Sequence, residues 1–370
     1  MLKKIEITNF KNFGEKFTFD LSDTSNFEFN KDCIKNGIVN KGLIYGYNAC
    51  GKSNLGLAIF DLISHLTDKY LSKAKYNNYI SANSFEEEVR FKFVFAFGNN
   101  IVEYEYTKYD VQTLIFEKLI INDKIFASVD RGESTIFTTS AKGAESLNKD
   151  LKDSKLSVIS YIEKNTILED TIENNIFKQF KDFINNMLFS KALDERFYIG
   201  YEEGEHILSD DIVKKGNLKE FEKFLNDAGL EYSLRSKKIS GVYQIFFKFD
   251  KREIEFFEAA SSGTKALCIF YFWYQRMKSD KTPSFLFIDE FDAFYHHDLS
   301  VLIIEKLKEI KNVQVILTTH NTSNISNRIL RPDCYFIMDN KKISSLKDRT
   351  YKELREAHNI EKMYKAGSFE

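Results

Sequence analysis

The sequence predicts an α/β protein whose central sheet carries a glycine-rich turn at residues 46–53. Three observations support this prediction. The turn lies between a short apolar strand and an amphipathic helix, residues 89–129 alternate between apolar and polar side chains, and a later apolar strand ends in Asp289 and Glu290. Because a strand repeats every 2 residues and a helix every 3.6, these patterns distinguish the two kinds of element.

The turn matches the pattern G-x-x-x-x-G-K-[ST], in which the backbone curls so that its N–H groups point at phosphate oxygens. Lys52 would reach the outer phosphates of a nucleotide, and Ser53 would bind Mg²⁺. Residues 42–45 form the preceding strand, and the apolar residues after the turn keep helical spacing from Leu55 to Leu66. The residues expected around the phosphates are Gly46, Asn48, Ala49, Cys50, Gly51, Lys52, Ser53 and Asn54.

The composition is that of an ordinary globular protein. Lys and Arg total 53 against 55 Asp and Glu, a net charge of −2, so the chain lacks the overall positive field of a dedicated nucleic-acid binder. Its four cysteines form no CxxC pair, which argues against a disulfide framework or a zinc site and fits a reducing cytosol. The longest apolar run, 266–274, is too short to cross a bilayer, so we expect a cytoplasmic protein.

Two alternating segments at the start of the chain, 2–8 and 17–21, have the period of half-buried strands. The turn between them contains Phe10, Lys11 and Phe13. An aromatic and basic turn of this kind can lie beside an adenine base. A polar turn capped by core phenylalanines is equally compatible with the same residues.

The middle of the chain changes from strands to helices. Segments 89–97 and 101–107 flank Gly98, and segments 114–121 and 124–129 flank Asn122-Asp123, which predicts an antiparallel sheet beside the nucleotide core. Between 150 and 240 the apolar residues adopt helical spacing, but no heptad is sustained. We therefore expect a compact α-helical insertion there.

After two further predicted strands, 243–249 and 253–257, residues 260–265 open an apolar helix. Ser262 and Gly263 lie at its N-terminus, where unpaired N–H groups and the helix dipole favour an anion. An ordinary serine N-cap explains the same residues.

The strand at 284–288 ends in the two adjacent carboxylates. Burying them is costly unless they hold a cation or transfer protons. In a phosphate-loop protein Asp289 would hold Mg²⁺ through water, and Glu290 would orient or deprotonate the attacking water. His320, after a helix near 299–310 and a strand at 313–317, could reach the γ-phosphate, although an ordinary loop histidine is the simpler alternative.

The order of these elements resembles that of the soluble ATP-binding-cassette (ABC) ATPases with structural-maintenance-of-chromosomes (SMC), RecF-like and OLD-type heads. The resemblance makes 46–53 the Walker A loop, 261–265 the signature motif, 285–290 the Walker B strand and His320 the switch histidine. It implies an ABC-type P-loop head with a mixed core sheet, an antiparallel β-subdomain and the helical insertion. The corresponding parts are an N-terminal lobe at 1–149, the insertion at 150–240 and a C-terminal lobe at 241–370.

The resemblance also implies a head-to-tail dimer that binds ATP and Mg²⁺ between its copies. Lys52, Glu290 and His320 would be catalytic, Ser53 and Asp289 would hold the metal, and Ser262 and Gly263 would reach the nucleotide from the other copy. Two family motifs stay unassigned: no aspartate in 292–298 is clearly that of the D-loop, and Gln112 is only a weak Q-loop candidate.

Residues 330–336 and 361–369 resemble small prokaryotic ATPases of abortive-infection operons, which are commonly encoded beside an RloB-type protein or another effector. This resemblance implies an antiphage ATPase that senses a phage-derived DNA structure or protein and controls a separate effector such as a nuclease. Residues 321–370 are too few for the Toprim nuclease domain of OLD-type proteins, so cutting is expected in a partner. A RecF-like repair ATPase and an assembly that ATP merely stabilises are the alternatives.

Overall fold

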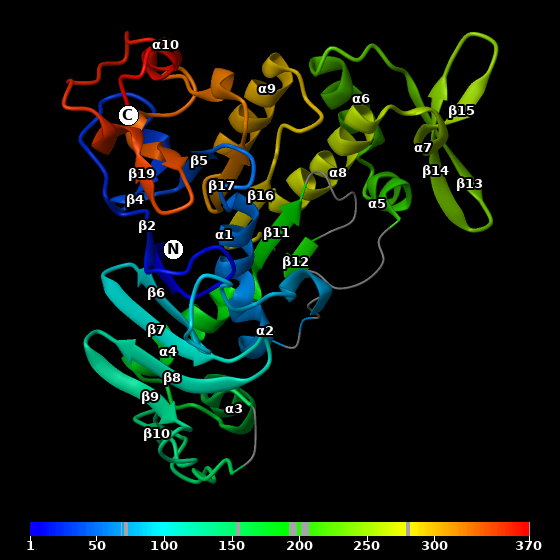
Figure 1. The fold of residues 1–370 in the computed structure, drawn as a ribbon. Coiled ribbons are helices and arrows are strands. Elements are labelled where there is room, and N and C mark those ends of the chain that lie inside the picture. Colours follow the sequence, from blue (N-terminus) through cyan, green and yellow to red (C-terminus); the bar gives the residue numbers. More distant parts are fainter. Residues whose placement is uncertain are drawn as a thin grey trace.

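The computed structural model describes residues 1–67, 69, 73–152, 156–191, 198–200, 207–278 and 282–369. Two seven-stranded sheets dominate it, one above the other in Figure 1. The core sheet has the order β12 (Tyr198–Gly200), β11 (Met187–Lys191), β16 (Phe285–Asp289), β17 (Gln314–Thr319), β5 (Lys41–Tyr45), β18 (Tyr335–Met338) and β19 (Ile343–Ser345).

The five central strands of the core sheet, from β11 to β18, are parallel, and the two edge strands are antiparallel to their neighbours. The sheet is therefore mixed, as the fold class predicted. The carboxyl ends of parallel strands meet at one edge, which is where ligands bind in open α/β sheets. Here the phosphate loop follows β5, Asp289 ends β16, and His320 follows β17.

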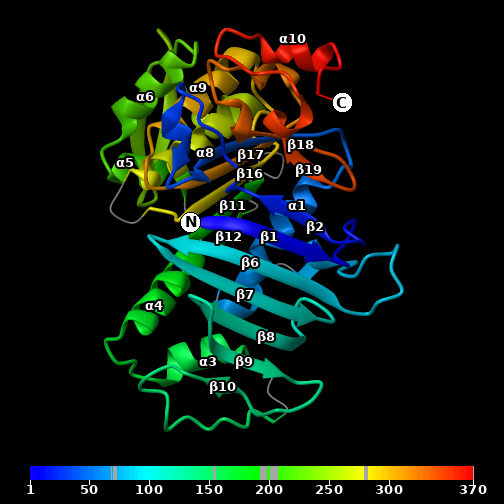
Figure 2. The same cartoon turned by 90° about the vertical axis from the view of Figure 1, so that its left-hand side faces the viewer.

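The second sheet is wholly antiparallel, and its hairpins confirm the predicted turns. Its order is β10 (Thr138–Thr139), β9 (Lys124–Asp130), β8 (Leu114–Ile121), β7 (Asn100–Lys108), β6 (Val89–Phe97), β1 (Leu2–Thr8) and β2 (Phe17–Asp20). Asn122 and Asp123 both have positive φ, 47° and 64°, as a two-residue type I′ hairpin requires. Figure 2 shows this sheet lying below the core sheet.

Helices cover both sheets. They are α1 (Lys52–Ile59), α2 (Ile63–Leu66), α3 (Val158–Asn165), α4 (Ile172–Asn185), α5 (Leu208–Lys214), α6 (Leu218–Asp227), α7 (Phe256–Ala259), α8 (Ser262–Met277), α9 (His297–Lys308) and α10 (Ile360–Lys365). The helical run after the phosphate loop is α1 and α2 joined by a 3₁₀ turn, and its predicted apolar face is buried. Helix α4 lies against the antiparallel sheet, where Phe180 contacts Phe95 and Tyr104.

The range 150–240 contains the expected helices, but it also supplies β11 to the core sheet. The helical spacing of the apolar residues continues from Ile172 to Met187, but the helix that it predicts is too long, since α4 ends at Asn185 and Met187 begins β11. The reason is tertiary, because Met187, Leu188 and Phe189 are buried beside β16. The division of the chain at 149 and 240 stays a prediction.

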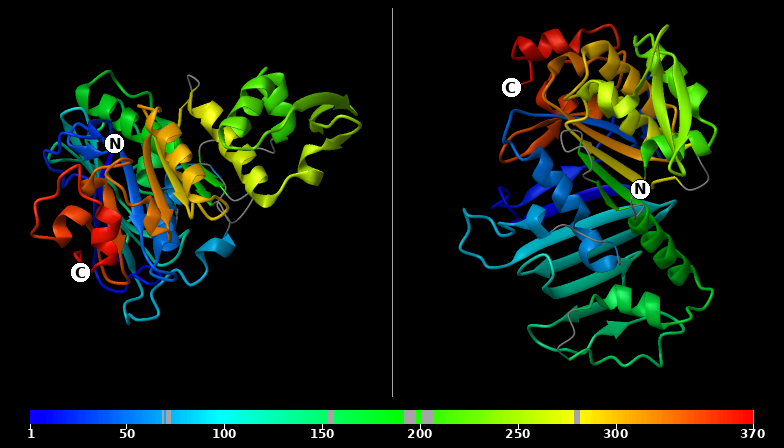
Figure 3. Two further views of the ribbon diagram at one scale, coloured as in Figure 1. Left: turned by 90° about the horizontal axis from the view of Figure 1, so that it is seen from above. Right: turned by 90° about the vertical axis from the view of Figure 1, so that its right-hand side faces the viewer.

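Residues 234–259 form a small lobe that extends away from the core (Figure 3, left). Its sheet has the order β13 (Leu234–Ile239), β14 (Val242–Lys248) and β15 (Glu253–Glu255). The predicted strand at 253–257 is too long, since Phe256 starts α7. The Glu255 side chain accepts a hydrogen bond from the Glu258 N–H and so caps this helix.

Candidate functional site

The phosphate loop joins the carboxyl end of β5 to the N-terminus of α1, and both of its glycines are required by their surroundings. Gly51 has φ 104°, and a Cβ there would lie 2.3 Å from Asn12 Nδ2. A Cβ on Gly46 would lie 2.7 Å from the Met338 carbonyl oxygen. Ala49 also has a left-handed backbone, with φ 63°. These conformations turn the loop tightly around the start of α1.

Lys52 is the buried cation of the loop. Its Nζ donates hydrogen bonds to the carbonyl oxygens of Gly46 at 2.7 Å and Tyr47 at 3.0 Å. Burial lowers the pKa of Lys52, and the nearby charges of Asp289 and Glu290 oppose that shift. The ammonium group therefore lies at the centre of the loop, between its carbonyls and the two carboxylates.

Asp289 is fully buried at the end of β16 and uses both carboxylate oxygens. Ser53 Oγ donates to Oδ2 at 2.5 Å, and Thr318 Oγ1 donates to Oδ1 at 2.8 Å. Oxygen ligands of this kind suit Mg²⁺, which takes one or two protein ligands and completes its shell with water and phosphate. Ser53 and Asp289 therefore fit the predicted metal.

Glu290 and His320 both line the cleft and contact each other. His320 Nε2 lies 3.1 Å from Glu290 Oε1, and His320 Nδ1 lies 3.2 Å from Lys52 Nζ. His320 Nδ1 also lies 3.0 Å from the Gly46 carbonyl oxygen, so the ring contacts the phosphate loop on one side and Glu290 on the other. The other oxygen of Glu290 is buried and has no hydrogen-bond partner within the described part of the chain.

These groups open onto a cleft of about 820 Å³, a volume in the range of small-molecule sites. Its lining consists of Asn48, Ala49, Gly51, Lys52, Ser53, Asn54, Glu290, Asp292, Ala293, His320 and Asn321. Three predicted residues lie behind this lining: Gly46 accepts a hydrogen bond from Lys52, Cys50 is buried under the loop, and Asp289 bonds Ser53.

Asp292, which the sequence left unassigned in the expected D-loop segment, and Thr318, which it did not single out, are both site residues. The carboxylate of Asp292 accepts hydrogen bonds from Thr319 Oγ1 at 2.6 Å and Asn324 Nδ2 at 2.7 Å. Burial raises the pKa of Asp292. Thr318, besides holding Asp289, accepts the Glu290 backbone N–H at 2.8 Å. Their only sequence signal is position, two residues after Glu290 and two before His320.

Ser262 and Gly263, in contrast, do not line this cleft. They begin α8, whose N-cap is Ser261, with its side chain accepting from the Thr264 N–H. The serine N-cap interpretation therefore holds for Ser261. A Cβ on Gly263 would lie 3.0 Å from the Phe294 carbonyl oxygen, so the start of α8 contacts the turn between β16 and α9.

A second groove of about 830 Å³ adjoins the cleft, and Asn54 lines both. Lys11, Asn12, Asn77 and Tyr109 are among its other lining residues. Asn54 Nδ2 donates to Asn12 Oδ1 at 2.6 Å. Phe10 and Phe13 are buried, as the core interpretation of this turn predicted, while its polar residues face the groove.

Gln112 lies outside the cleft. It is exposed on the turn between β7 and β8, where its backbone N–H donates to Asp110 Oδ1. The structure therefore does not bring this weak Q-loop candidate to the phosphate loop. On the side of β16 that faces away from β17, the neighbouring strand is β11, which ends at Lys191.

Residues 43–326 match the model of the family described as "AAA domain, putative AbiEii toxin, Type IV TA system". The chain belongs to this family. The match begins in β5 and ends within the segment that follows β17, so it includes the phosphate loop, Asp289, Glu290 and His320. None of the curated proteins compared with the chain matches it.

Several solved structures are similar to the chain. An SMC head bound to the C-terminal winged-helix domain of ScpA is 18% identical, with 93% of this chain and 97% of that chain covered and a TM-score of 0.48. The SMC head of Thermotoga maritima is 15% identical, with coverages of 93% and 97% and a TM-score of 0.43. RecF with ATP is 16% identical, with coverages of 94% and 99% and a TM-score of 0.41.

Within the described residues, no helix combines the length and the apolar character needed to cross a membrane.

Proposed function

We propose that this protein is a Mg²⁺-dependent ATPase. One observation carries the proposal: Lys52 and Ser53 at the start of α1 meet Asp289 and Glu290 at the end of β16, although Ser53 and Asp289 are 236 positions apart. Lys52 supplies a cation that can bind phosphate, and Ser53 and Asp289 supply oxygen ligands for a metal. Glu290 supplies a carboxylate that can accept a proton from water. The adjoining groove, lined by Lys11, Asn12 and Tyr109, has the polar and aromatic groups to take the nucleotide base.

Each residue has a role in this proposal. Lys52 and the loop N–H groups bind the β- and γ-phosphates, Ser53 and Asp289 hold Mg²⁺, and Glu290 accepts a proton from the attacking water. Bound Mg²⁺ neutralises charge that develops on the transferred phosphoryl group. His320 keeps Glu290 and Lys52 in position, because its two ring nitrogens contact both.

The complete site needs a second copy of the chain. Ser262 and Gly263 lie at the start of a 16-residue helix but outside the cleft of their own copy. We propose that they close the cleft of a partner in a head-to-tail dimer. ATP then holds the two copies together, and hydrolysis loosens them.

The biological role that we propose is antiphage defence, in which the ATPase controls a separately encoded effector such as an RloB-type protein or a nuclease. The description of the family, which joins an AAA domain to a toxin–antitoxin system, supports this role. Co-purification with the product of the neighbouring gene, with and without ATP, tests it. Turnover stimulated by plain DNA ends or gaps, with no effector bound, would indicate a repair ATPase instead.

The Glu290→Gln variant tests the proposed hydrolysis. We expect ATP turnover to fall by about 10²-fold or more, because general bases typically contribute 10²- to 10⁴-fold. ATP binding should persist, and size-exclusion chromatography with ATP should show a stable dimer. Glu305→Gln, on the exposed side of α9, is the matched control and should leave turnover unchanged.

Unchanged turnover in Glu290→Gln would overturn the assignment of Glu290. Wild-type protein that binds ATP but never hydrolyses it would instead indicate an assembly that ATP merely stabilises.

A further inference from the structure

Lys191 lies next to the proposed metal site. None of the predicted motifs contains this lysine. It is the last residue of β11, which pairs in parallel with β16 so that Lys191 is in register with Asp289. Its Nζ lies 3.9 Å from Asp289 Oδ2. The Lys191 side chain is 29% exposed, whereas that of Asp289 is fully buried.

The packing of α1 places these two side chains on the same face of the core sheet. A Cβ on Gly56 of α1 would lie 2.5 Å from Phe189 Cε2 and 2.9 Å from Phe287 Cε1, so both rings face this helix. Alternate residues of a strand share a face. Lys191 and Asp289, two positions further along β11 and β16, therefore point to the side on which α1 begins with Lys52 and Ser53.

Lys191 and Ser53 converge on the same carboxylate oxygen. Asp289 Oδ1 bonds Thr318, so Oδ2 is the oxygen that faces Ser53, its proposed partner in metal binding. The Lys191 ammonium lies near this oxygen and does not line the nucleotide cleft. The group of the site that lies beside it is therefore the Asp289 carboxylate.

We propose that Lys191 is a positioning residue that competes with Mg²⁺ for the charge of Asp289. In the absence of metal its ammonium compensates the buried carboxylate. When Mg²⁺ enters with ATP, the like charge of Lys191 weakens metal binding, so that the metal stays only while phosphate oxygens complete its shell. This inference rests on the proposed function, because it takes Ser53 and Asp289 as the metal site.

The test measures binding of a non-hydrolysable ATP analogue with excess Mg²⁺ and with EDTA. The dissociation constant in EDTA divided by the dissociation constant with Mg²⁺ reports how much the metal strengthens binding. Removing a positive charge close to the metal should strengthen that contribution, so we expect the ratio to rise roughly tenfold in Lys191→Met. Lys191→Arg, which keeps the charge, should leave the ratio within about twofold of wild type.

Lys178→Met removes an exposed positive charge from α4 and controls for net charge. An unchanged or lower ratio in Lys191→Met, with an unfolding midpoint like that of wild type, overturns the inference alone. A higher ratio in Lys191→Arg as well would show that the exact side chain matters rather than its charge, and would also overturn it. Wild-type protein that binds the analogue equally well without Mg²⁺ overturns the proposed metal site and the inference together.

Discussion

Three residues of the cleft have left-handed backbone conformations: Ala49, Gly51 and Glu290, with φ of 63°, 104° and 52°. For residues other than glycine this conformation costs about 1 to 2 kcal/mol. Such strain persists only where surrounding contacts hold it, and it clusters at functional sites. The Glu290 backbone is held by the hydrogen bond from its N–H to Thr318 Oγ1, which aims the side chain at His320.

Gly51→Ala should weaken nucleotide binding strongly. The new Cβ must tolerate a positive φ and also meets Asn12 Nδ2 at 2.3 Å, so the loop has to change shape. We expect ATP affinity, measured by calorimetry, to fall by about 100-fold or more. Gly98→Ala is the matched control, because Gly98 has φ 61° but no neighbour within 4 Å.

The control should lower the free energy of unfolding by only about 1 to 2 kcal/mol and leave ATP affinity unchanged. Equal effects of the two substitutions on ATP affinity would contradict this account of the loop.

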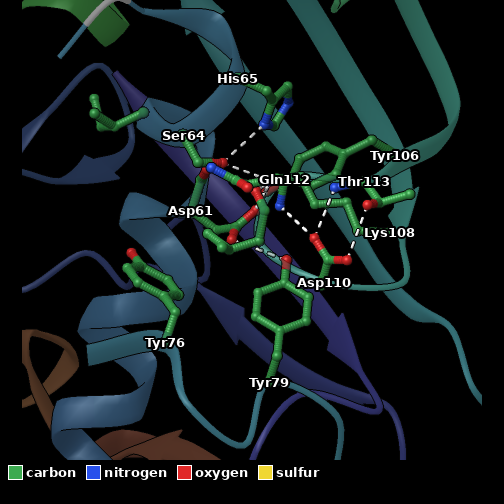
Figure 4. A network of polar contacts seen from close by, with 12 residues as sticks. Asp61, Ser64, His65, Tyr76, Tyr79, Tyr106, Lys108, Asp110, Gln112 and Thr113 are labelled. Carbon is green, nitrogen blue, oxygen red and sulfur yellow. Dashed lines mark hydrogen bonds and ion pairs between the residues drawn. The ribbon is translucent and has the colours of Figure 1, made fainter. Parts of the chain in front are cut away.

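At the scale of elements, a buried polar network centred on Asp61 ties the helices after the phosphate loop to the antiparallel sheet (Figure 4). Asp61 accepts hydrogen bonds from Tyr79 and Tyr106 at 2.9 Å and from Lys108 Nζ at 2.6 Å. Burial lowers the pKa of Lys108, and Asp61 opposes that shift. Ser64 accepts a hydrogen bond from Lys108 Nζ at 2.5 Å, and the neighbouring His65 is half-buried, with its pKa held well below the usual value by loss of contact with water.

Lys108→Met should therefore destabilise the protein strongly. It leaves the Asp61 carboxylate buried without its counter-charge, and breaking a buried ion pair costs roughly 3 to 5 kcal/mol. Lys92→Met is the control, because the Lys92–Glu103 pair on the same sheet has a similar 2.6 Å separation but is 38% and 28% exposed.

The control should cost less than about 1 kcal/mol. Urea unfolding measures both values. A cost for Lys108→Met as small as that for Lys92→Met would show that the Asp61 network does not hold the two layers together.

The C-terminal helix α10 contacts two segments that border the cleft. The Tyr364 ring lies 5.2 Å from that of Tyr45, directly before the phosphate loop, and Glu361 accepts from Ser323 Oγ at 3.3 Å. Ser323 lies in the loop that follows His320. One short helix therefore packs against both the strand before the phosphate loop and the loop after His320.

At the scale of the whole molecule, the cleft draws its residues from distant parts of one chain but leaves Ser262 and Gly263 outside. A head-to-tail dimer predicts complementation between variants. Lys52→Ala damages the cleft of its own copy, whereas Ser262→Arg damages only the cleft of its partner. Each variant alone should be inactive, and a mixture should recover part of the wild-type ATP turnover, because mixed dimers contain one intact site.

A mixture of Lys52→Ala with Glu290→Gln is the control for this experiment. Both substitutions damage the cleft of their own copy, so no intact site forms and no turnover should return. Failure of Lys52→Ala and Ser262→Arg to complement each other, despite exchange of subunits, would contradict the two-copy site.

The sequence by itself determined the local features of this protein. The phosphate loop, the hairpins of the antiparallel sheet and the apolar strand before Asp289 and Glu290 were all predictable, since each depends on periodicity, turn residues and a motif within a short segment. The left-handed backbone at Gly51 is likewise a local feature, because glycine adopts this conformation without strain.

Tertiary structure alone decided which of these segments meet. Local pattern does not encode strand order, so β17 between β5 and β16, and β11 beside β16, could not be read from periodicity. The burial of Met187 turned the end of an apparent helical pattern into a strand, and parallel pairing then brought Lys191 to Asp289. Contacts of this kind depend on packing between distant segments, which is why Lys191, Thr318 and the contacts of Asp292 emerged only from the folded molecule.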